Sequence, residues 1–166
     1  VLLFNSKAVI FYRIPAILFL FIIGVTSYFF SLRINFNKSE SIINGLITVS
    51  SIYIIAIIFE APWDIFAHGF MFIAIYYLFN SFKNSFTKNH NILIGILIGL
   101  SIMSKGPISI YALLIPFLLS YLLVYKKISL NNLIIILFIS IVSGGMWYLY
   151  VYTQDYNTLL DIGAQE

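Results

Sequence analysis

Six long apolar runs constrain this chain more than any other feature of its sequence. They cover residues 14–32, 41–59, 63–80, 91–104, 107–125 and 131–152. Most have about 20 residues, the length at which a helix crosses the hydrocarbon core of a bilayer. None shows the alternation of a barrel strand, and helices satisfy their own backbone hydrogen bonds inside lipid. The sequence predicts one all-α, polytopic transmembrane bundle with about six spanning helices.

Composition supports lipid as the solvent of this chain. Hydrophobic residues make up 61% of it and charged residues only 9%, whereas soluble domains have about 25% charged residues. There is no cysteine, which excludes disulfides and thiolate metal sites within these residues. There is also no basic cluster of the kind that binds nucleic acid.

The distribution of charge predicts the orientation of the bundle. If each run spans once, the connections alternate between the two sides of the membrane. One side then collects six of the nine basic residues, and the other collects five of the six acids. The six basic residues are Arg33, Lys38, Lys83, Lys88, Lys126 and Lys127. The positive-inside rule places this basic side in the cytoplasm.

The first candidate site is the stretch Glu60-Ala-Pro-Trp-Asp64, followed by His68. Pro62 suits the first turn of a helix. Asp64 would lie in the same turn, where the helix dipole favours a negative charge. His68 lies one turn deeper on the same face. Two interpretations remain open. Asp64 either caps its helix with His68 beside it, or it orients a substrate, a basic partner or a divalent metal.

The second candidate site is Ser104-Lys105-Gly106-Pro107. The preceding run is short for a span, so either its helix begins within the polar stretch before it or Lys105 lies below the outer interface. An ammonium beside a helix start favours an anion such as phosphate. The alternative is a lysine that extends to water at an ordinary turn.

The third candidate site is the C-terminal stretch from Trp147-Tyr148 to Gln165-Glu166. Its aromatic residues fit the belt at a membrane interface. Residues 153–166 are polar, and the default expectation for them is a solvated loop on the outer side.

Three landmarks together resemble a known family. They are Glu60-Ala-Pro-Trp-Asp64, Ser104-Lys-Gly-Pro107 and Trp147-Tyr-Leu-Tyr-Val-Tyr152 with its acidic tail. Their order and spacing resemble the membrane core of bacterial GT-C glycosyltransferases, in particular the aminoarabinose-transferase and protein O-mannosyltransferase-like group. The resemblance implies an enzyme that moves a sugar from a polyprenyl-phosphate carrier to a lipid, glycan or protein acceptor of the cell envelope. It also implies a multi-pass protein of the bacterial cytoplasmic membrane, with its active face outside.

The resemblance also assigns roles to residues. Lys105, with Ser104 and Gly106, would bind the carrier's phosphate, and Asp64 would be a supporting catalytic residue. Substrate contacts are further expected from Glu60, His68 and Glu166. The main catalytic carboxylate is expected upstream of Val1, and a soluble domain beyond Glu166. We therefore expect this segment to be part of a longer protein and to be inactive alone.

Two other functions fit the sequence. One is a transporter or flippase for an anionic lipid or solute. In such proteins the N-termini of broken helices also point at an anion, although near the bilayer midplane. A non-catalytic membrane scaffold would tolerate replacement of the polar residues. No cofactor is certain, and a divalent metal is left open.

Overall fold

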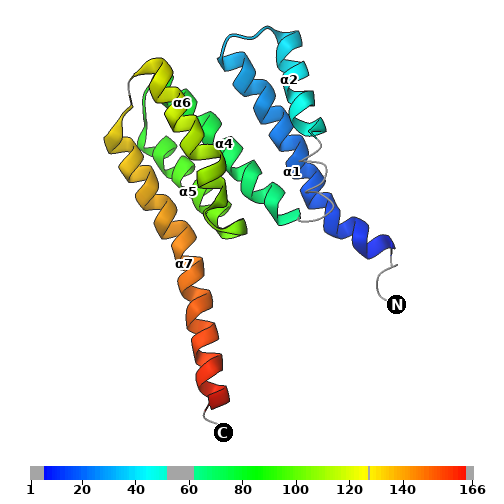
Figure 1. The fold of residues 1–166 in the computed structure, drawn as a ribbon, viewed down its shortest axis with the longest axis vertical. Coiled ribbons are helices and arrows are strands. Elements are labelled where there is room, and N and C mark those ends of the chain that lie inside the picture. Colours follow the sequence, from blue (N-terminus) through cyan, green and yellow to red (C-terminus); the bar gives the residue numbers. More distant parts are fainter. Residues whose placement is uncertain (1–5, 52–61, 127, 164–166) are drawn as a thin grey trace.

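The computed structural model describes residues 6–51, 62–126 and 128–163, and this part of the chain is an assembly of helices (Figure 1). The helices are α1 (Ser6–Arg33), α2 (Lys38–Ser50), α4 (Pro62–Asn84), α5 (Lys88–Lys105), a π-helical segment η2 (Ile110–Leu114), α6 (Ile115–Tyr125) and α7 (Leu130–Gly163). The predicted all-α membrane bundle is confirmed.

The helices form two neighbouring groups. α1 packs against α2 as an antiparallel hairpin, and α1 also contacts α4 (Figure 1). α5 packs between α4 and α7. The buried core lies where these helices meet, and Met71 and Leu78 of α4, Ile94 and Ile98 of α5 and Ile136 of α7 belong to it.

In the part of the chain that the structure describes, three helices are long and apolar enough to cross a membrane by length and composition. These candidate spans are Arg13–Arg33, Trp63–Asn84 and Leu130–Asp155, with Ile110–Tyr125 as a shorter apolar helix. Large apolar side chains such as Phe21, Leu123 and Phe138 face outward. In water so much exposed apolar surface would drive association, whereas lipid accommodates it.

Polar residues at one end of the bundle begin and end the helices. Asn37 and Glu40 form a capping box at the start of α2, and the Thr87 hydroxyl caps α5. Lys126 ends α6 in a left-handed conformation. The connections α1–α2, α4–α5 and α6–α7 all lie at this end (Figure 1). The Lys83 ammonium of α4 donates to the Arg33 carbonyl of α1 at 2.8 Å and so links the α4–α5 connection to the α1–α2 connection. Basic residues thus gather at one end, as the charge pattern predicts.

Small residues allow close packing of α5 against α7. A Cβ added at Gly99 would lie 1.9 Å from the Ser143 Oγ and 2.9 Å from the Ser143 Cβ. A Cβ at Gly95 would lie 2.7 Å from Ile139. Contacts between small residues are typical of membrane helix pairs, because they let the backbones approach.

One prediction about the C-terminal stretch is wrong. Residues from Thr153 onward were expected to form a solvated loop, but α7 continues to Gly163 and projects beyond the other helices (Figure 1). Residues 153–162 contain no proline or glycine that would break the backbone hydrogen bonds, and an existing helix extends at little cost.

Candidate functional site

Asp64 lies in the first turn of α4, as predicted. Pro62 begins this helix, and Asp64 is its acidic residue near the N-terminus. The helix dipole favours a carboxylate there. The side chain is only 8% exposed, and its Oδ1 has no hydrogen-bond partner among the described residues. A buried carboxylate in this position requires a compensating charge.

Lys105 supplies that charge from the neighbouring helix. It is the last residue of α5 and forms an ion pair with Asp64, its Nζ donating to Oδ2. The short apolar run before Lys105 is explained by the start of α5 at Lys88, inside the preceding polar stretch. The helix has 18 residues, or roughly 27 Å at about 1.5 Å per residue. Lys105 therefore lies at the end of the helix, with its side chain 36% exposed.

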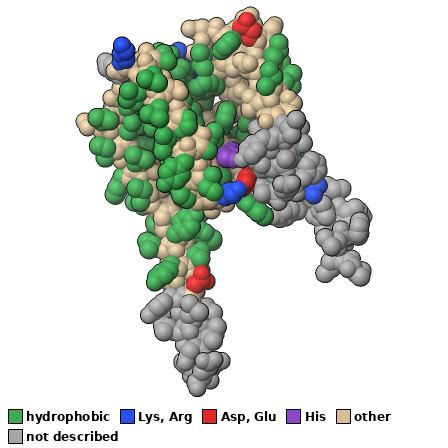
Figure 2. Space-filling model, viewed as in Figure 1, with side chains coloured by type: hydrophobic (Ala, Val, Ile, Leu, Met, Phe, Trp, Pro, Cys, Tyr) green, Lys and Arg blue, Asp and Glu red, His purple; other side chains and the backbone are tan. Residues whose placement is uncertain are grey.

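His68 lies one turn deeper than Asp64 on α4. It is partly buried and interacts electrostatically with both Asp64 and Lys105. An acidic and a basic side chain meet beside a histidine in Figure 2, on a face that is otherwise largely apolar. The three side chains thus form one polar cluster, which joins two stretches about 40 residues apart in the sequence.

Gly106 has a backbone conformation that requires glycine. Its φ is +79° and its ψ is −165°, a region that residues with a Cβ rarely enter. Its N–H donates to the Ile102 carbonyl at 2.6 Å. The chain can then turn at Pro107 towards η2. Gly106 therefore ends α5 directly after Lys105.

The other predicted site residues lie in different situations. The Ser104 hydroxyl donates to the Leu100 carbonyl of its own helix at 2.9 Å. Its hydroxyl proton is therefore engaged within the helix. Glu60 and Glu166 lie outside the described residues.

Side chains that could ligate a metal are sparse in the described part of the chain. No group of three or more His, Cys, Asp or Glu side chains with suitable placement occurs among the described residues. Asp64 and His68 supply only two such groups, and Lys105 occupies one oxygen of Asp64.

Two residues near the cluster make contacts that were not predicted from the sequence. The buried Ser101 hydroxyl of α5 donates to the Ala67 carbonyl of α4 at 2.7 Å. This bond lies one turn from Lys105 on one helix and about one turn from Asp64 on the other. The Tyr148 hydroxyl of α7 donates to the Ile102 carbonyl of α5 at 3.2 Å. A serine within an apolar run gives no signal of its partner. Tyr148 was expected within the third candidate stretch as an interfacial aromatic residue, without a role of its own.

Fold and site together define an all-α, multi-pass membrane protein with a charged cluster where its helices end. The sequence matches the family model of the dolichyl-phosphate-mannose-protein mannosyltransferases over residues 2–148. The chain belongs to this family, and hence to the GT-C superfamily of glycosyltransferases. No curated protein and no solved structure matches it.

Proposed function

We propose that this protein transfers a sugar from a polyprenyl-phosphate carrier to an acceptor of the cell envelope, at the extracytoplasmic face of a bacterial cytoplasmic membrane. The observation that carries the proposal is the Asp64–Lys105 pair. It lies at the ends of α4 and α5 that are remote from the basic connections. Family membership supports a carrier-linked donor, because the family is named for one.

Lys105 is suited to bind the phosphate of the carrier. An ammonium has three N–H donors, and Asp64 takes one of them. Two donors remain on a side chain that is partly open to its surroundings. Negative charge develops on the carrier phosphate as its bond to the sugar breaks, and a fixed cation stabilises that charge.

Asp64 has two functions in this proposal. Its Oδ2 holds the Lys105 ammonium in place. Its buried Oδ1 is left to accept a hydrogen bond from a hydroxyl of the sugar or the acceptor. Carboxylates in such positions orient or deprotonate hydroxyl groups in transfer reactions. Here Asp64 is assigned the orienting part, and His68 lines the same cluster.

The position of the cluster also favours an enzyme over a transporter. Transporters with broken helices hold their substrates near the midplane of the bilayer. Asp64 lies in the first turn of α4 and Lys105 is the last residue of α5. A site at the ends of helices suits a donor whose phosphate lies in the interfacial region and whose chain remains in lipid.

The test is transfer from polyprenyl-phosphate mannose by the full-length protein in proteoliposomes. Lys105→Met should lower the transfer rate by about 100-fold or more, the usual effect of removing one donor that stabilises developing charge. Lys88→Met removes a lysine from the opposite end of the same helix and should leave the rate within about twofold. Wild-type transfer by Lys105→Met would overturn the proposal, as would transfer from a nucleotide sugar alone.

The proposed active face can be tested separately. The sequence has no cysteine, so single cysteines can be introduced at exposed positions near the two ends of the bundle. Lys88→Cys should be protected from a membrane-impermeant maleimide added to intact cells, and Thr153→Cys should be labelled. The reverse pattern would place the cluster on the cytoplasmic side.

A further inference from the structure

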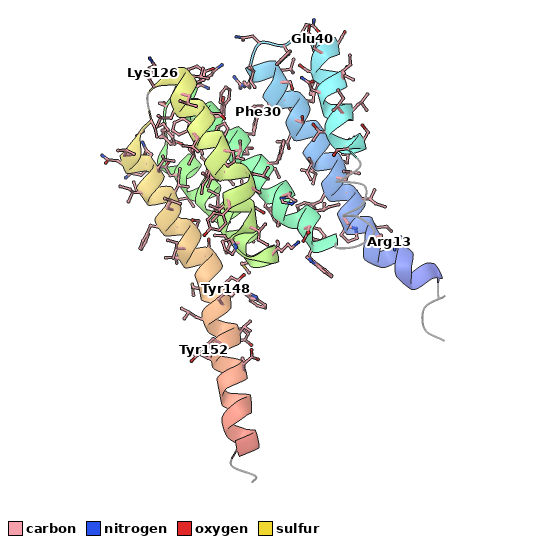
Figure 3. All side chains as sticks on the ribbon, in the orientation of Figure 1. Arg13, Phe30, Glu40, Lys126, Tyr148 and Tyr152 are labelled. Atoms are coloured by element: carbon pink, nitrogen blue, oxygen red, sulfur yellow. The ribbon has the colours of Figure 1, made fainter. Side chains whose placement is uncertain are left out.

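The Tyr148 hydroxyl links α7 to the end of α5 that carries Lys105. It donates to the Ile102 carbonyl at 3.2 Å across 46 residues of sequence. Figure 3 shows Tyr148 where α7 leaves the other helices, and Tyr152 farther along the projecting part. The hydroxyl is therefore used within the protein, although the residue is partly exposed.

Ile102 is a critical position for the end of α5. The last carbonyls of a helix lack partners from a following turn, and unsatisfied ends fray. The Ile102 carbonyl receives two donors, the Gly106 N–H and the Tyr148 hydroxyl. Lys105 lies between Ile102 and Gly106, within this turn. The position of its ammonium depends on that turn keeping its shape.

Gly106 brings the turn close to the same hydroxyl. A Cβ added at Gly106 would lie 3.3 Å from the Tyr148 hydroxyl oxygen. The hydroxyl therefore donates to the Ile102 carbonyl on one side of Lys105 and lies close to Gly106 on the other.

We propose that Tyr148 is a positioning residue, whose hydroxyl fixes the last turn of α5 so that the Lys105 ammonium faces the phosphate of the donor. This inference rests on the proposed function and adds a residue from a third helix to it. Tyr148 acts through Lys105 and is assigned no contact with the substrate.

Tyr150 provides a matched control for the role of the hydroxyl. It lies on the same helix, and the exposed fractions are 57% for Tyr150 and 48% for Tyr148. Its ring packs near Trp147, and in the described part of the chain its hydroxyl has no hydrogen bond to α5. If both tyrosines only anchor α7 at the membrane interface, their phenylalanine variants should behave alike.

The test is a double-mutant cycle on binding of polyprenyl phosphate to the protein in nanodiscs. Tyr148→Phe should weaken binding by about fivefold, the effect of one lost hydrogen bond, and Tyr150→Phe should not change it. In a Lys105→Met background, Tyr148→Phe should cause no further loss, because residues that act through one another are not additive. Equal losses in both backgrounds, or no loss in the single variant, would overturn the proposal.

A second measurement separates this inference from the proposed function. If wild-type protein does not bind polyprenyl phosphate, the proposed function fails, and acylation of Lys105 by an amine-reactive ester then decides the inference. Tyr148→Phe should speed acylation of Lys105 relative to that of Lys88, because the ammonium is held less firmly against Asp64. An unchanged ratio would show that Tyr148 does not position Lys105. Thermal unfolding of both phenylalanine variants checks that the fold is retained.

Discussion

The Lys105 ammonium donates to the Asp64 carboxylate and so joins the last residue of α5 to the first turn of α4. The carboxylate is almost fully buried, whereas the ammonium is partly exposed. The acid therefore depends on the lysine for compensation of its charge, and the lysine retains donors for a ligand. This asymmetry leads to different expectations for the two side chains.

Asp64→Asn should impair sugar transfer more than it impairs folding. The amide keeps the size of the side chain and an oxygen that accepts from Lys105, but it removes the charge that holds the ammonium. We expect a loss of about tenfold or more in the transfer rate, with a small change in the midpoint of thermal unfolding in detergent. Parallel losses of folded protein and of activity would instead support a purely capping role for Asp64.

Ser101→Ala should loosen the contact between α4 and α5 beside the cluster. The variant removes the buried hydrogen bond to the Ala67 carbonyl, which should cost about 1 kcal/mol in the free energy of unfolding. Ser104→Ala is the matched control, because among the described residues the Ser104 hydroxyl bonds to the Leu100 carbonyl of its own helix and to no other helix. Equal stability of the two variants in denaturant titrations would show that the interhelical bond contributes nothing.

Gly106→Ala should destabilise the end of α5. Alanine at a φ of +79° and a ψ of −165° is expected to cost about 1–3 kcal/mol. The added Cβ would also lie near the Tyr148 hydroxyl. We expect faster amide exchange in the last turn of α5, measured by mass spectrometry, together with reduced transfer. Unchanged exchange in this turn would contradict the conformation described for Gly106.

Gly99→Ala should weaken the packing of α5 against α7. The new Cβ would overlap the Ser143 side chain, and overpacking of this kind typically costs about 1–3 kcal/mol. Gly145→Ala is the matched control, because its Cβ would meet nothing within 4 Å. Alanine is also the better helix former, so this variant should be neutral or slightly more stable. Thermal unfolding of both variants tests the contact, and equal effects would argue against close packing at Gly99.

Much of the architecture could be predicted from residue order because lipid imposes simple rules. Long apolar runs must be helices, and the α1–α2 and α6–α7 connections lie at one end of the bundle, as the charge pattern predicts (Figure 1). Asp64 in the first turn of α4 follows from Pro62 just before it. The C-terminal end of α7 was harder to predict, because a polar composition beyond Thr153 is compatible with both a loop and a helix.

By itself the sequence determined the class of fold, the gathering of basic residues at one end of the bundle, and the two short stretches that carry Asp64 and Lys105. It could do so because hydropathy and helix-start preferences act locally. Only the tertiary structure decided that these residues form an ion pair, and that the hydroxyls of Ser101 and Tyr148 join α5 to α4 and α7. Such contacts depend on how α4, α5 and α7 are packed and rotated against one another. That packing arises from many small contacts, such as those of Gly99 and Ser143, which no single stretch of sequence contains.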